Sequence, residues 1–223
     1  MKKGHQLLRK GISFCLLLPI LLSTGFDNVS DKYDIETPSG MVYIEEGMSL
    51  LGAEEGDLNA KNDAKPRHPV YLKSYYIDTL EVTNGAYAEC VAAGVCAEPA
   101  DTSSATRANY YDVSTFQGYP VVNVTWDDAQ TYCEFVGKRL PTEAEWEKAA
   151  MGTIDYRRYP WGNGEPKAYL INVTDIPGDT ETVNSYPTGS SPYGLVDTAG
   201  NVSEWVSDWY ATSYYAESVL ENP

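Results

Sequence analysis

The sequence has few of the residues that most often build metal centres and catalytic triads. Its 223 residues include 2 histidines and 4 cysteines, and only His68 lies outside the N-terminal segment. A histidine-rich zinc site or a Ser-His-Asp triad therefore has almost no material from which to form. We interpret His68 as a structural residue.

Basic residues are scarce as well. The chain has 16 Lys and Arg against 32 Asp and Glu, and its formal net charge is −16. Such a surface repels phosphate backbones and anionic headgroups, because binding to either depends on Lys and Arg. We therefore expect no nucleic-acid partner. Two explanations of the acidity stay open: solubility of an exported protein, or binding of calcium or a basic substrate.

The apolar run near the N-terminus is too short to cross a membrane. It extends over about eleven residues, from Ile12 to Leu22, whereas a bilayer core is about 30 Å thick, and Pro19 interrupts it. Basic residues precede the run, and Ser23 and Gly25 follow it, in the three zones of a secretory signal peptide. We predict a signal peptide over 1–25, a secreted or periplasmic location and no permanent membrane anchor.

Export places the remaining cysteines in an oxidising compartment, where pairing is expected. Cys90 and Cys96 flank a glycine-containing turn that one short disulfide can close. Cys15 lies in the apolar run and is expected to be removed with the leader. Cys133 is then left without a partner. It is either a buried free thiol or a cysteine whose partner lies outside this chain.

The rest of the chain divides into a linker and one domain. Residues 26–39 are polar and predict a flexible linker, and the domain extends over 40–223. Within it, hydrophobic patterns predict strands over 41–44, 70–77 and 121–124. Capping residues predict three helices, over 84–93, from Thr125 to Val136, and from Thr142 to a stop at Gly152. Beyond Tyr159, proline and glycine are so frequent that we expect loops.

Five segments in order resemble the signature blocks of the formylglycine-generating enzyme (sulfatase-modifying factor) family. They are Asp78–Asn84, Pro120–Ala129, Gly137–Ala149, Tyr159–Gly162 and Ala199–Trp205. The resemblance covers the chain from Gly40 to its end. It implies an α+β fold, a variant of the C-type lectin-like fold that is loop-rich, with short strands and a few helices, and incomplete here at the C-terminus.

The resemblance also implies a chemistry. The family's founding activity oxidises the cysteine of a sulfatase-type Cys-x-Pro-x-Arg peptide to formylglycine, with oxygen and a copper ion held by two cysteines. In the family those cysteines follow a segment that this chain does not reach, so we expect neither catalytic residues nor copper here. In some members the cysteine at the position of Cys133 pairs with a distant C-terminal cysteine. A non-catalytic peptide- or glycan-binding module is the alternative function.

The resemblance finally implies structural calcium. Ca²⁺ takes about six to eight oxygen ligands, many of them carboxylates and backbone carbonyls. The expected ligands lie in two loops, the first with Ala199, Gly200, Val202 and Glu204, and the second with Asn172, Val173 and Asp175. Asx-turns at Asn172 and Asp175, and a buried salt bridge at Glu204, are the alternative interpretations.

Overall fold

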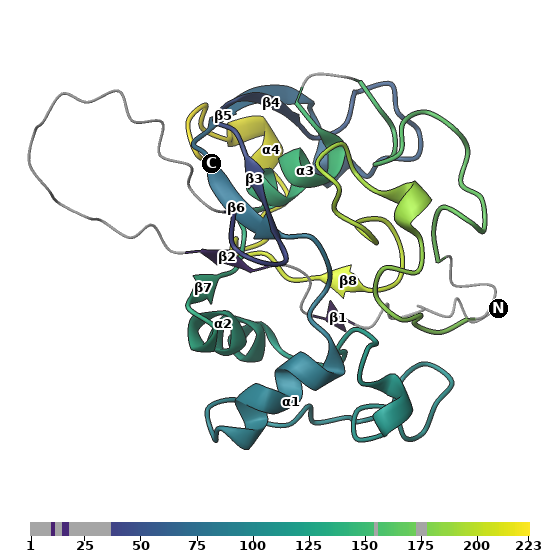
Figure 1. Cartoon of the computed structure of the whole chain (residues 1–223). Coiled ribbons are helices and arrows are strands. Elements are labelled where there is room, and N and C mark those ends of the chain that lie inside the picture. The colour runs from purple at the N-terminus through teal and green to yellow at the C-terminus, as the bar shows by residue number, and fades with distance from the viewer. Residues whose placement is uncertain (1–9, 12–14, 18–36, 154–155, 173–177) are drawn as a thin grey trace, which may run out of the picture.

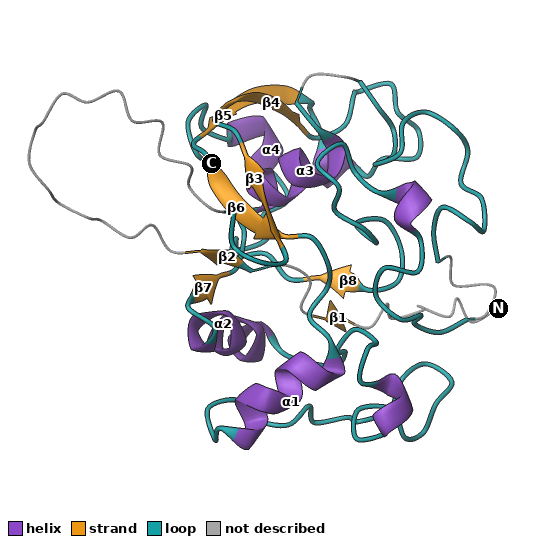
Figure 2. Cartoon of the chain, viewed as in Figure 1, coloured by secondary structure: helices purple, strands orange, loops and turns teal. Residues whose placement is uncertain are grey.

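The computed structural model describes residues 10–11, 15–17, 37–153, 156–172 and 178–223, and Figure 1 shows their arrangement. The strands are β1 (Lys10–Gly11), β2 (Leu16–Leu17), β3 (Met41–Ile44), β4 (Gly47–Leu51), β5 (His68–Leu72), β6 (Tyr75–Asp78), β7 (Lys138–Arg139) and β8 (Ser203–Glu204). The α-helices are α1 (Asn84–Ala92), α2 (Trp126–Phe135), α3 (Glu143–Met151) and α4 (Tyr214–Glu217). Loops make up much of the remainder, as Figure 2 shows.

A small four-stranded sheet, built from strands that are far apart in the sequence, lies at the centre of the fold. Its strand order is β3-β6-β2-β7, with antiparallel neighbours. Strands β4 and β5 form a separate antiparallel pair, and β1 lies parallel to β8. The strand predicted over 41–44 is confirmed. The one predicted over 70–77 is divided, because the chain leaves β4 after Leu72, passes through exposed Lys73 and Ser74, and then pairs with β3.

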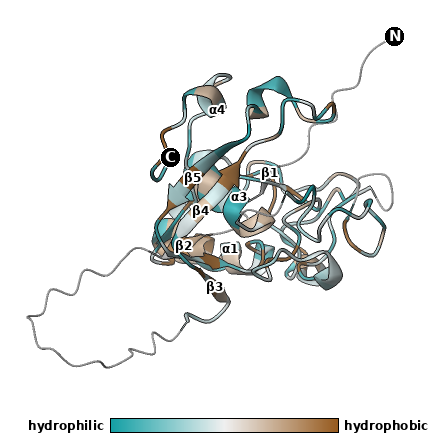
Figure 3. Cartoon of the chain, turned by 90° about the horizontal axis from the view of Figure 1, so that it is seen from above, coloured by the Kyte–Doolittle hydropathy of each residue, from teal (hydrophilic) through white to brown (hydrophobic). Residues whose placement is uncertain are grey.

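Two hydrophobic clusters meet at this sheet. One contains residues of α1 and α2, and the other contains residues of β3 to β6 and α3. Two neighbouring residues at β2 belong to different clusters, Cys15 to the first and Leu16 to the second. This is the alternation expected when successive side chains point to opposite faces of a sheet. Seen from above, hydrophobic colour marks parts of the central strands (Figure 3).

The predicted helix starts are confirmed by their caps. The side chain of Thr83 accepts a hydrogen bond from the backbone of Ala86, which opens α1. Capping boxes open the next two helices, Thr125 with Asp128 at α2 and Thr142 with Glu145 at α3. Each box satisfies backbone N–H groups that the first helical turn leaves unpaired.

The strand predicted over 121–124 is wrong. Val121, Val122 and Val124 are all buried, but no strand forms over them in the described chain, where isolated bridges occur at Val122 and between Thr83 and Pro120. Asn123 has a φ of 61°, in the left-handed region, which ends extended structure at this point. The hydrophobic pattern therefore indicated burial correctly and the backbone conformation incorrectly.

The loop-rich half is held by a buried carboxylate. Asp179 is 8% exposed and accepts hydrogen bonds from the hydroxyls of Ser104 (2.6 Å) and Thr106 (2.7 Å). Arg107 lies 3.3 Å from it and also packs over the rings of Phe116 and two tyrosines. Burial would raise the pKa of Asp179, but the hydrogen bonds from Ser104 and Thr106 outweigh it and lower the pKa to about 2. This carboxylate joins two loops about seventy residues apart.

All four cysteines are paired, Cys90 with Cys96 and Cys15 with Cys133. The second disulfide corrects two expectations, that Cys15 takes no part in the domain and that Cys133 has no partner in the chain. The Cys15–Cys133 disulfide can form because β2 inserts between β6 and β7. This position brings Cys15 beside α2, where Cys133 is buried.

Processing of the N-terminus stays a prediction. Residues 1–9, 12–14 and 18–25 of the predicted signal peptide, and 26–36 of the predicted linker, lie outside the described residues. Among the helices that the structure does describe, none has the length and apolar character needed to cross a bilayer.

Candidate functional site

The two predicted calcium loops lie against each other. The side-chain amide of Asn172 donates to Oδ1 of Asn201 over 3.0 Å, and the backbone N–H of Asn201 donates to the carbonyl of Asn172 over 3.3 Å. Gly200 makes this approach possible, because a Cβ at its position would lie 2.4 Å from the same carbonyl. Val173 and Asp175, also predicted as ligands, lie outside the described residues.

The remaining predicted ligands surround this contact. Val202 is buried, Ala199 is half-buried and Gly200 is exposed. Glu204 lies on β8, and its Oε2 accepts a hydrogen bond from the indole N–H of Trp146 on α3. Its carboxylate links the predicted loop to α3.

Two carboxylates that the sequence did not single out lie at the same place. Glu81 is 3% exposed; its Oε2 accepts from the side-chain amide of Asn201 at 3.0 Å, and its Oε1 has no hydrogen-bond partner. Asp197 is 5% exposed and accepts from the backbone of Asn184. The signal available in the sequence was an acidic residue in an apolar context, since Glu81 lies between Leu80 and Val82.

Burial and mutual repulsion oppose ionisation in this group. Burial, followed by the charges of Asp197 and Glu204, raises the pKa of Glu81 well above its usual value. Burial likewise raises the pKa of Asp197 to about 6. A cation would relieve both effects, because an unpaired buried carboxylate is costly.

The donor chemistry fits calcium in part. Carboxylate, amide and carbonyl oxygens are the ligands that hard cations prefer. Within the described ranges, however, no three His, Cys, Asp or Glu side chains converge closely enough to ligate one ion. A calcium ion here would therefore need backbone carbonyls beside Glu81.

Comparison with known proteins identifies the family. Residues 27–221 match the family model described as the Sulfatase-modifying factor enzyme 1-like domain. The chain belongs to this family. The predicted resemblance to formylglycine-generating enzymes is thus confirmed, and the loop-rich α+β architecture agrees with it.

The chain covers a different share of each relative's length. It is 34% identical to the formylglycine-generating enzyme of Streptomyces coelicolor, over 82% of this chain and 73% of that enzyme. It is 38% identical to the serine/threonine-protein kinase pkn1 of Chlamydia caviae, over 82% of this chain but only 30% of the kinase. The solved structure of PvdO from Pseudomonas aeruginosa superposes with a TM-score of 0.64 at 25% identity, covering 82% of this chain and 75% of PvdO.

The four cysteines are the residues to compare with the copper site that the family resemblance implies. Monovalent copper prefers thiolates, and a thiolate must be free to bind it. Each of the four cysteines is instead locked in a disulfide. Cys90 and Cys96 therefore form a structural loop closure.

Proposed function

We propose that this chain is an exported formylglycine-generating-type domain that recognises a cysteine-containing, sulfatase-type peptide and that lacks oxidase activity over its 223 residues. Family membership and the formylglycine-generating relatives support the choice of peptide. The observation that carries the lack of oxidation is that Cys90 and Cys96 are bonded to each other, so that even removal of the leader with Cys15 would leave Cys133 as a single thiol and not a pair. The three-zone leader supports export, and the disulfides are compatible with an oxidising compartment.

The decisive experiment separates binding from oxidation. A fluorescent Cys-x-Pro-x-Arg peptide is incubated with the full chain, oxygen and copper(I), and both its anisotropy and its mass are followed. We expect the peptide to keep its thiol, because no thiolate pair is available to hold copper. A matched peptide with serine in place of cysteine measures the contribution of the thiol to binding. Conversion of the cysteine to an aldehyde would place oxidase chemistry in this chain.

A non-catalytic glycan-binding module is the second candidate, and one surface favours it. Trp209 is 90% exposed and stacks on Trp126 with ring centroids 6.3 Å apart, and neighbouring Tyr210 is 75% exposed. Exposed flat aromatic faces are characteristic of binding surfaces, because large exposed apolar groups are otherwise unfavourable. Quenching of tryptophan fluorescence by oligosaccharides, without any change in peptide anisotropy, would favour this candidate.

We also propose that Ca²⁺ stabilises the contact between the two predicted loops. The unpartnered Oε1 of buried Glu81, beside Asp197 and Glu204, supports this role. The carbonyls of the loop around Gly200 would complete the oxygen ligands. The ion would then act on folding stability, and no step of a reaction is assigned to it.

A further inference from the structure

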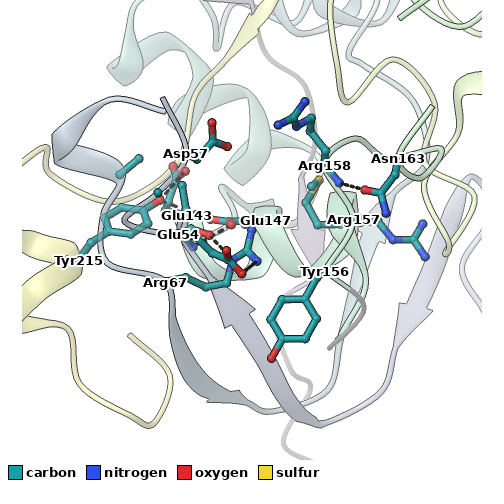
Figure 4. A pocket seen from close by; sticks show the side chains of 15 residues that line it. Glu54, Asp57, Arg67, Glu143, Glu147, Tyr156, Arg157, Arg158, Asn163 and Tyr215 are labelled. Atoms are coloured by element: carbon teal, nitrogen blue, oxygen red, sulfur yellow. Dashed lines mark hydrogen bonds and ion pairs between the residues drawn. The ribbon is translucent and has the colours of Figure 1, made fainter. Parts of the chain in front are cut away.

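A large open pocket lies apart from the loops discussed above. It has a volume of about 810 Å³ and is formed by the segment after β4, one side of α3 from Glu143 to Met151, residues 156–158 and Tyr215 of α4 (Figure 4). Pockets of this size are typical of sites for small molecules. None of the predicted calcium ligands that the structure describes lines it.

Two glutamates of α3 form one wall of this pocket. Glu143 and Glu147 are one helical turn apart, and the hydroxyl of Tyr215 lies between them, 3.3 Å from Oε1 of Glu143 and 3.4 Å from Oε2 of Glu147. The other oxygen of Glu147 accepts from the backbone of Gly52 over 2.9 Å. Tyr215 has one proton to donate, so it can satisfy only one of the two carboxylates at a time.

The carboxylate pair has no ion-pair partner. Among the described residues, no Lys or Arg nitrogen lies within the 4 Å of an ion pair from either glutamate. Arg67, whose charge lowers the pKa of Glu147, is instead bound to Glu54 and to the carbonyl of Gly52. Burial and the charge of Glu143 raise the pKa of Glu147 to about 7, although the Gly52 hydrogen bond lowers it. Among the described residues, the half-buried pair is therefore held by hydrogen bonds from Tyr215 and Gly52, and the charge of Arg67 acts on Glu147 from beyond ion-pair distance.

The opposite side of the pocket is basic. Figure 4 shows Arg157 and Arg158 on the other side of the pocket from the two glutamates, and Tyr156 also lines it. Arg158 is exposed, and its backbone N–H donates to the side chain of Asn163. A ligand with a positive head at the glutamates and a negative group at the arginines would match both walls.

We propose that this pocket binds a small organic cation, a guanidinium or ammonium compound, with its charged head between Glu143 and Glu147. A planar guanidinium can donate to two carboxylates at once, and would be the ion-pair partner that the pair lacks among the described residues. Two carboxylates are too few for a metal ion, and no third metal-ligating side chain joins them among the described residues. The large volume also favours an organic ligand. This inference is independent of peptide oxidation and of calcium.

Free L-arginine is the first probe, and L-citrulline is its neutral counterpart of similar shape. Isothermal titration of the full chain at pH 8 should show saturable binding of arginine and none of citrulline. The Glu147→Gln variant keeps an acceptor for Gly52 but loses the charge, so its affinity for arginine should fall by about tenfold or more. The exposed Glu98→Gln variant is the matched control and should bind as the wild type does.

The pH dependence supplies a second readout. Affinity should weaken as the pH falls below about 7, where Glu147 takes up a proton, and arginine binding near that pH should release protons to the buffer. The charged and titratable groups facing Glu147 are Glu143, Tyr215 and Arg67, with Glu54, Asp57, Arg157 and Arg158 on the remaining lining. Equal binding of citrulline, unchanged affinity in Glu147→Gln, or no binding of arginine at millimolar concentration would overturn the proposal.

Discussion

Replacing Asp179 with alanine is expected to lower the free energy of unfolding by about 3–5 kcal/mol, the range found when one partner of a buried charged network is removed. The substitution removes the acceptor shared by Ser104 and Thr106 and leaves Arg107 without its carboxylate partner. Urea unfolding followed by circular dichroism measures the loss. The exposed Asp112→Ala variant is the control, and it should change stability by less than about 0.5 kcal/mol.

The same carboxylate should give a pH signature. Its pKa is lowered from 3.8 to about 2 in the folded state, so it contributes about 2 kcal/mol at neutral pH. This stability is present above about pH 4 and is lost as the pH falls toward 2. Asp179→Asn, which keeps the shape and folds more readily than the alanine variant, should lack this acid-dependent loss. An Asp179→Asn protein as stable as wild type at pH 7 would contradict the role assigned to Asp179.

Calcium at about 100 times its dissociation constant is expected to raise the free energy of unfolding by about 2.7 kcal/mol, because it binds the folded chain and hardly the unfolded one. The melting temperature should rise with Ca²⁺ and fall with a chelator. Mg²⁺ should substitute poorly, since it requires shorter octahedral bonds and loses water reluctantly. Differential scanning calorimetry of the full chain measures all three conditions.

Two variants distinguish this site from a general salt effect. Glu81→Gln removes a buried charge while keeping an acceptor for Asn201, so without calcium it should be more stable than wild type. It should also lose most of the response to calcium. Glu89→Gln, at an exposed position, should keep the wild-type response. If the wild-type melting curves in calcium and in chelator are identical, the chain has no calcium site at these loops.

Local features of the sequence predicted the helices well. The Thr125 and Thr142 capping boxes act within a single turn, so their geometry depends on a few adjacent residues. The prediction of a strand over 121–124 was wrong because hydrophobic periodicity indicates burial only. The left-handed conformation of Asn123 depends on its surroundings in the fold. The side-chain amide of Asn123 donates to carbonyls about twenty residues away, including that of Ser103 at 2.7 Å.

The candidate site was predictable only where a resemblance pointed to it. The motif around Gly200 and the segment at Asn172 were identified in this way, and the structure places them in contact. Glu81 was missed because its burial arises from packing between segments more than a hundred residues apart. Cys15 was assigned to the leader by its apolar neighbours, and its pairing over 118 residues follows from where β2 inserts in the sheet.

Counting free thiols in the full 223-residue chain, oxidatively folded and then denatured without reduction, tests most directly whether every cysteine is structural. We predict none. A chain that begins at residue 26 should show one free thiol, mapped to Cys133, with Cys90 and Cys96 still linked. Two reactive thiols in the full chain, mapped to Cys90 and Cys96, would contradict the account, because they would provide the thiolate pair that copper chemistry requires.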